Sequence, residues 1–76
     1  MHLKRGIKII DFLKEVQGCK DEVLFTTDEG DILNLNSVLS RYIFVTITEK
    51  PELLFNAEIV CRKKEDQERL AEFLTT

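Results

Sequence analysis

The apolar residues near the start of the chain recur with the spacing of one helix face. Ile9, Phe12, Leu13 and Val16 stand at positions i, i+3, i+4 and i+7, which matches the 3.6 residues of a helical turn. The charged residues between them fall mostly on the opposite face. Gly18 follows the last apolar position, where a left-handed glycine commonly ends a helix. We therefore expect an amphipathic helix that ends at Gly18 and lies on a sheet.

Three later stretches alternate between apolar and polar residues, as strands with one buried face do. Residues 22–27 and 32–35 are joined by a short turn, in which Gly30 supplies the positive φ that a tight hairpin needs. Residues 57–62 alternate in the same way. Residues 65–74 begin with acidic side chains and then carry an apolar stripe, a pattern that predicts a helix at the end of the chain.

Residues 37–54 fit two structures equally well. Residues 42–48 are rich in β-branched and aromatic side chains, which favour a strand. The spacing of the apolar residues after Ser37 instead fits a helix that starts there. The residues leave both structures open for 42–48, and we favour a short helix over residues 37–43 followed by a bridging segment.

Composition indicates one soluble domain over residues 1–76. Apolar residues make up 43% of the chain and charged residues 33%, which is typical of a compact domain near the lower size limit for a single core. The apolar runs are too short to span a bilayer, and the basic start lacks the apolar region and cleavage site of a signal peptide. We expect a cytoplasmic protein that does not bind membranes.

The charge distribution favours a protein partner over nucleic acid. Residues 1–20 carry five basic and two acidic side chains, whereas residues 21–36 carry five acidic and no basic ones. Such a dipolar chain can orient a protein partner. The net charge of −3 and the pI near 5.1 lack the broad basic surface that phosphate backbones require.

The residues offer little equipment for catalysis. Cys19 and Cys61 match no metal-ligand spacing, and the single histidine, His2, stands far from both. We interpret the two cysteines as buried thiols and expect neither a metal nor a cofactor. The chain also lacks a plausible nucleophile–base pair and a glycine-rich phosphate loop, so we expect no enzyme.

The order of these elements resembles HPr, the phosphocarrier protein of the bacterial sugar phosphotransferase system, over roughly residues 9–74. The features that carry the resemblance are Phe12 in the first helix, the 23–25 strand, the Gly30 turn, the Asn34-x-x-Ser37-Val38-Leu39 segment, the 58–60 strand and the acidic start of the last helix. The resemblance implies an α+β fold of the open-faced β-sandwich type. A small antiparallel sheet would carry three helices on one face.

The resemblance also implies that the reactive histidine of the family is missing. In the family, a histidine at the start of the first helix carries the phosphate, and an arginine follows two residues later. Register from Phe12 places Arg5 at the histidine position and Ile7 at the arginine position. His2 lies three residues earlier and is only a weak candidate, because the terminus would have to fold back to use it.

Ser37 matches the regulatory serine that is phosphorylated in some members of the family. A phosphate at a helix start gains backbone N–H donors, so the position suits such a modification. The simpler interpretation, which we favour, is that Ser37 only caps the helix, a role worth about 1 kcal/mol. Arg41 and Tyr42 also replace the small and apolar residues that usually make this helix a docking surface in the family.

The first strand of the family fold is short or missing in this chain. Only residues 1–5 could pair, and in the family that strand lies beside the one equivalent to residues 57–62. Its loss would leave N–H and C=O groups near Ile59 unpaired, and such an edge invites another chain. We therefore expect a homodimer through this edge.

These observations favour a non-catalytic HPr-like module that binds proteins or regulates them. Its partners would include components of the phosphotransferase system. Two alternatives stay open: an active phosphocarrier that uses His2, and a generic small α+β module that binds a small ligand.

Overall fold

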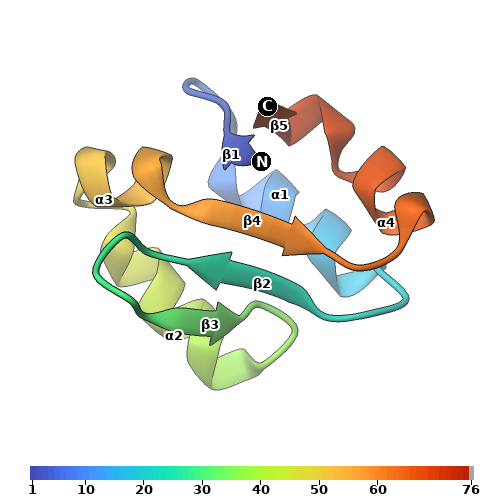
Figure 1. Cartoon of the computed structure of the whole chain (residues 1–76), viewed down its shortest axis with the longest axis horizontal. Helices are drawn as coiled ribbons and strands as arrows, with labels where there is room; N and C mark the ends of the chain where they lie inside the picture. The colour runs from blue at the N-terminus through green and yellow to red at the C-terminus, as the bar shows by residue number, and fades with distance from the viewer. Residues whose placement is uncertain (76) are drawn as a thin grey trace.

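The computed structural model, which describes residues 1–75, contains both helices and short strands (Figure 1). The expected α+β class is confirmed, and the first strand is indeed short, with two residues. Residues 1–75 form four α-helices, one more than the sequence indicated. The elements are β1 (His2–Leu3), α1 (Ile9–Gln17), β2 (Val23–Thr26), β3 (Ile32–Asn34), α2 (Val38–Ile47), α3 (Pro51–Asn56), β4 (Glu58–Cys61), α4 (Lys64–Arg69), the 3-10 turn η1 (Ala71–Phe73) and β5 (Leu74–Thr75).

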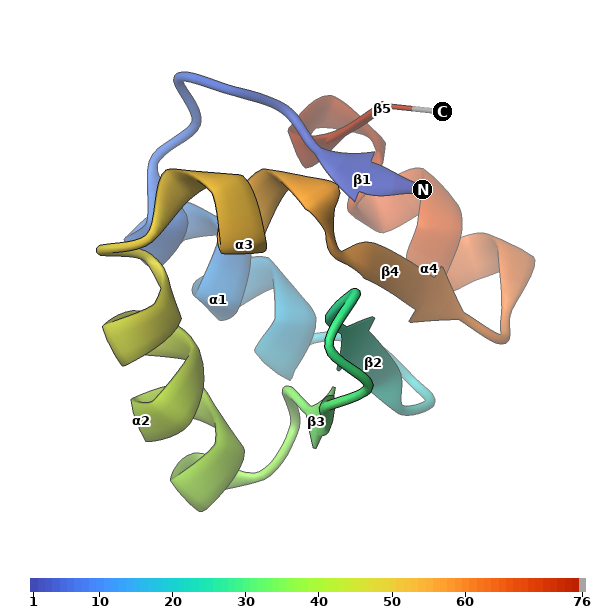
Figure 2. The same cartoon turned by 60° about the vertical axis from the view of Figure 1, so that its left-hand side comes forward.

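The main sheet has three antiparallel strands in the order β3-β2-β4. α1 and α2 lie behind this sheet in Figure 1, and the turned view in Figure 2 shows both on the same side of it. The opposite face carries no helix among residues 1–75 in either view. The architecture is therefore open-faced, as expected.

The predicted alternation of the strands is confirmed by their burial. Val23 and Phe25 on β2 are fully buried, as are Ile59 and, nearly, Cys61 on β4. Phe25 stands directly opposite Ile59 in the β2–β4 register, so the two strands present one continuous apolar face to α1 and α2. The polar side chains of both strands fall on the other face, because successive side chains of a strand alternate.

The hairpin between β2 and β3 turns at Gly30, as predicted. Gly30 has a φ of 94°, a conformation that costs a residue with a Cβ atom about 1–2 kcal/mol. The N–H of Gly30 donates to the carbonyl oxygen of Thr27 at 3.1 Å, and the N–H of Thr27 donates to that of Asp31 at 2.8 Å. These bonds fix the register of the two strands.

Gly18 ends α1, but the expected left-handed conformation is wrong. Its φ is −87°, because the chain continues as a right-handed turn in which the N–H groups of Gly18 and Cys19 donate to the carbonyls of Glu15 and Val16. A Cβ atom at this position would meet the guanidinium of Arg69, the end of a flexible side chain that can move aside, so neither the backbone conformation nor the available space requires glycine here.

α2 runs to Ile47, so the short helix predicted over residues 37–43 is wrong at its end. The β-prone residues after position 43 are helical because this places Phe44 inside the core. The ring of Phe44 is fully buried and lies 5.0 Å from the ring of Phe25 and 6.0 Å from that of Phe12. Packing therefore outweighs the strand propensity of this segment.

The bridging segment expected after residue 43 is replaced by the end of α2 and by α3. Pro51 stands in the first turn of α3, where its missing N–H is not needed and its fixed φ suits the helix. The N–H of Leu54 donates to the carbonyl of Lys50 at 3.0 Å, and the side chain of Leu54 is buried. α3 therefore fills the space between α2 and β4 as a packed element.

The helix predicted over residues 65–74 is wrong beyond position 69. Its apolar residues Leu70, Phe73 and Leu74 are buried as expected, but α4 ends at Arg69 and is followed by η1 and β5. The reason is a pairing that the sequence did not reveal. Leu74 stands opposite Leu3 in the antiparallel pair of β5 with β1.

The edge of β4 that we expected to be unpaired is largely occupied. The N–H of Ile59 donates to the carbonyl of Met1 at 2.6 Å. The carbonyl of Ala57 lies 2.8 Å from Nδ1 of His2, and Nε2 of Gln67 donates to the carbonyl of Cys61 at 2.9 Å. A homodimer through this edge stays a prediction, and it would have to compete with these contacts.

Candidate protein-docking surface

The surface between α1 and α2 is built from helix faces that their own core contacts leave free. α1 buries Phe12, Leu13 and Val16 against the sheet. Ile10 lies on the same helix but outside this stripe, and 65% of its surface is exposed. Full burial of an apolar side chain of this size contributes about 1.5–3 kcal/mol of hydrophobic free energy. Because Ile10 is mostly exposed, most of this contribution is absent in the isolated chain.

α2 carries most of the exposed apolar side chains of the described chain. Of the ten residues of α2, only Phe44 is buried within the described chain. Tyr42 is 70% exposed and Leu39 69%. A helix that is apolar around most of its surface is normally buried on more than one side. The exposed apolar residues of α2 are Val38, Leu39, Tyr42, Ile43 and Val45.

A groove of about 370 Å³ separates the two helices. We call it the α1–α2 groove. The only charged residues along it, within the described chain, are Lys14 and Arg41. The groove therefore has an apolar lining and a cationic rim, although the whole chain is acidic. Its lining residues are Ile10, Leu13, Lys14, Gln17, Val38, Arg41, Tyr42 and Val45.

Ser37 precedes α2 at one end of this surface. Its backbone is extended, with φ −85° and ψ 134°, and its carbonyl accepts the N–H of Arg41 at 3.0 Å. It therefore occupies the N-cap position, as predicted. Its hydroxyl, however, makes no capping hydrogen bond within residues 1–75, so the expected contribution of a side-chain cap is missing.

His2 belongs to β1, and its side chain lies against Ala57 and Glu58 at the start of β4, not at the start of α1. Its Nδ1 is 2.8 Å from the carbonyl oxygen of Ala57, and its Nε2 is 3.4 Å from Oε1 of Glu58. The Met1 amino group, 2.8 Å from Oε2, is the main cause that lowers the pKa of Glu58 below its usual value, and His2 adds to it. The imidazole is therefore held beside a carboxylate.

Arg5 lies in the connection between β1 and α1. Its guanidinium carbon stands 4.6 Å from the centre of the Phe55 ring, a cation–π contact with α3. This contact gives Arg5 a structural role in packing against α3, and that role does not involve phosphate binding. Arg5 and His2 line the same depression beside α3, which is distinct from the α1–α2 groove.

The two cysteines are poor nucleophiles in this structure. Both thiols are free among the described residues, Cys61 buried and Cys19 half-buried. Burial raises the pKa of Cys19 to about 11 and also raises that of Cys61, with Asp66 as the second cause in both. Little thiolate forms at neutral pH, and the thiolate is the reactive species. Within residues 1–75, no three His, Cys, Asp or Glu side chains gather as metal ligands would.

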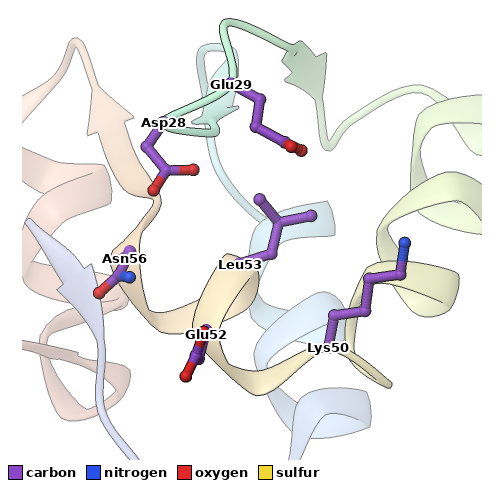
Figure 3. Close-up of a pocket in the computed structure, with 6 residues that line it drawn as sticks. All are labelled: Asp28, Glu29, Lys50, Glu52, Leu53 and Asn56. Atoms are coloured by element: carbon purple, nitrogen blue, oxygen red, sulfur yellow. The ribbon is translucent and has the colours of Figure 1, made fainter.

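A second depression, of about 480 Å³, lies between the β2–β3 turn and α3 (Figure 3). Asp28 and Glu29 reach it from the turn, and Glu52 and Lys50 come from the region of α3. Its carboxylates are exposed. Such a cluster of solvated acids is typical of an ordinary polar surface, so we do not treat it as a site.

Sequence reasoning identified His2, Arg5 and Ser37 but missed the groove. The structure does not bring these three residues together. A signal for the groove was present in Ile10, which is apolar beside the predicted stripe. The helical extent of α2 was the missing information, because only a full-length helix places Val38, Tyr42 and Val45 on one side.

Scans of this chain against protein-family models, curated proteins and solved structures found no match. The HPr-like resemblance therefore rests on the residues quoted above and stays a hypothesis. Within residues 1–75, none of the helices combines the length and apolar character needed to cross a membrane.

Proposed function

We propose that this chain is a non-catalytic HPr-like module that binds another protein through the α1–α2 groove. The observation that carries the proposal is the concentration of exposed apolar side chains on α2 and at Ile10. Contiguous apolar surface of this kind, with a polar rim, marks interaction sites in soluble proteins. Burial in a complex would recover the hydrophobic free energy that these side chains lack in the isolated chain.

The non-catalytic part of the proposal is supported by the surroundings of His2 and Arg5. Addition of a phosphoryl group to His2 would bring negative charge beside the carboxylate of Glu58, 3.4 Å away, and like charges at this distance repel. Arg5 occupies the position that the resemblance gives to the reactive histidine, and its guanidinium stays protonated at neutral pH, so it lacks the neutral ring nitrogen with which a histidine accepts a phosphoryl group.

The binding part is tested by site-specific photo-crosslinking in the native host. A photoreactive phenylalanine analogue replaces Tyr42, and a matched chain carries it at Ile32, which is 65% exposed on the open sheet face. We expect a discrete heavier adduct from position 42 that disappears when Val45→Asp is added. Equal adducts from both positions, or none from position 42, would contradict the proposal.

The absence of phosphotransfer is tested separately. The chain is incubated with phosphoenolpyruvate and enzyme I, and its intact mass is measured. We expect no change of mass. An acid-labile adduct of one phosphoryl group that is lost in His2→Ala would establish the phosphocarrier alternative instead.

A further inference from the structure

We propose that the α1–α2 groove receives an amphipathic helix of another protein whose apolar stripe is flanked by acidic residues. This inference rests on the proposed function and names the chemistry of the partner. Three properties of the groove lead to it: the spacing of its lining residues, the state of its backbone and the sign of its charges.

The lining residues follow helical spacing on both sides of the groove. α1 contributes Ile10, Leu13, Lys14 and Gln17, which stand at i, i+3, i+4 and i+7. α2 repeats the same spacing from Val38 to Val45. Seven residues of helix rise about 10 Å, so the groove is about two helical turns long. This length fits a partner helix that anchors itself with side chains at i, i+3 or i+4, and i+7.

The backbone of the groove excludes recognition by strand addition. All of its lining residues lie in α1 or α2, where the interior N–H and C=O groups bond within the helix. An extended peptide laid here would leave its own backbone groups facing apolar side chains without partners, which is costly. A helix satisfies its backbone internally and avoids this cost.

The charges of the groove select an acidic partner. Lys14 and Arg41 are its charged lining residues within the described chain. The acidic residues of α1, Asp11 and Glu15, do not line the groove; they line a neighbouring depression with Glu72, which Lys14 also borders. Glutamates or aspartates beside the apolar stripe of the partner would therefore meet Arg41 and Lys14 in the groove itself, which favours encounter and register.

The same charges disfavour a second copy of this chain as the occupant. A two-fold dimer places the same patch on both sides of the interface. The Lys14 and Arg41 side chains of both copies would then share one interface, and no acidic lining residue of the described groove would neutralise them. Self-docking here would bring like charges together as apolar surface is buried.

Two synthetic helical peptides of about 15 residues test the inference with the full chain. Both carry leucines at i, i+3, i+4 and i+7, flanked by glutamates in one peptide and by lysines in the other. We expect the acidic peptide to shift the backbone amide NMR signals of α1 and α2, to bind about tenfold more tightly than the basic one, and to weaken as salt is added.

A charge-reversed chain provides the matched control. In the double variant Lys14→Glu with Arg41→Glu, we expect the preference to switch to the basic peptide while the circular dichroism spectrum stays unchanged. Equal binding of both peptides, or an unchanged preference in the variant, would overturn the acidic partner.

The same measurements distinguish failure of this inference from failure of the proposed function. If neither peptide binds while Tyr42 still yields a hetero-adduct in cells, the helical partner is wrong and the docking surface stands. If the adduct from position 42 has the mass of two copies of this chain, the second copy is the occupant and the inference is overturned.

Discussion

Asp66 joins two segments that lie far apart in the sequence. Its side chain is buried, with 2% exposed, and its two oxygens accept the N–H groups of Lys20 at 2.8 Å and Asp21 at 3.0 Å. The contact between Lys20 and Asp66 spans 46 residues. One carboxylate at the start of α4 thereby fixes the loop between α1 and β2.

The pH dependence of stability should report this contact. The Lys20 N–H is the main cause that holds the pKa of Asp66 below its usual value. Because the folded pKa is lower than the unfolded value of about 3.9, the stabilisation is present above that value and is lost as the pH falls through the folded pKa. We expect Asp66→Asn to lower the Tm by several degrees at neutral pH, and by progressively less in acid, in thermal melts followed by circular dichroism.

Asp28 offers the matched control, since it is an exposed aspartate in the β2–β3 turn. The Tm of Asp28→Asn should differ little from that of the unmodified chain at every pH. If Asp66→Asn lowers the Tm by the same amount throughout the acidic range, packing and not the charge of Asp66 stabilises its contact with the loop between α1 and β2.

Asn36 makes a second connection through a single side chain. Its Oδ1 accepts the N–H of Val23 at 2.8 Å, at the start of β2. Asn36→Ala would leave that N–H without its acceptor, so we expect a loss of about 1–3 kcal/mol in chemical denaturation. Asn36→Asp keeps the acceptor oxygen, so its free energy of unfolding should fall clearly less. Equal losses of stability in the two variants would contradict the role of Asn36 as the acceptor for Val23.

At the scale of elements, α2 shows where sequence reasoning reached its limit. The alternation of β2 and β4 was predictable because one face of each strand is buried and the other is not. The segment after Ile43 was not predictable, because its β-branched residues favour a strand while the pocket for Phe44 requires a helix. Long-range contacts decide between the two, and neither Phe12 nor Phe25 is a sequence neighbour of Phe44.

Substitutions along α2 test this helical assignment. Phe44→Ala should lose about 3–5 kcal/mol, because it opens a cavity between Phe12 and Phe25. Tyr42→Ala should change stability by less than about 0.5 kcal/mol, because Tyr42 is exposed. Both residues would face the same side of a strand, so similar losses in urea denaturation would argue for a strand.

At the scale of the whole molecule, the candidate site was partly predictable. The N-cap position of Ser37 followed from the sequence, since an N-cap has a local signature, whereas the expected capping hydrogen bond of its hydroxyl is absent within residues 1–75. The groove beside Ser37 did not follow from the sequence, because it needs two helices whose relative placement depends on the shared core. The open sheet face lies opposite α1 and α2 (Figure 1 and Figure 2), so a partner bound at the proposed groove would leave that face uncovered.

The first and last strands of the described residues pair, and the segment that contains β1 also covers the free edge of β4. β1 pairs with β5, and the carbonyl of Met1 accepts the N–H of Ile59 on β4. Removal of residues 1–4 would leave both that N–H and the backbone groups of β5 without their partners. Because unpaired strand edges recruit other chains, we expect the shortened chain to self-associate in sedimentation velocity more strongly than the full one.

Leu3→Ala separates the effect of the edge from that of the core. Leu3 is buried, with 3% exposed, so this variant should lose about 2–5 kcal/mol of stability while its backbone can still cover β4. We expect it to be less stable and yet no more associated than the full chain. If it associates as strongly as the shortened chain, exposed apolar surface drives assembly. If the shortened chain is folded and monomeric, the edge of β4 is not an assembly site, and the homodimer expected from the sequence loses its physical basis.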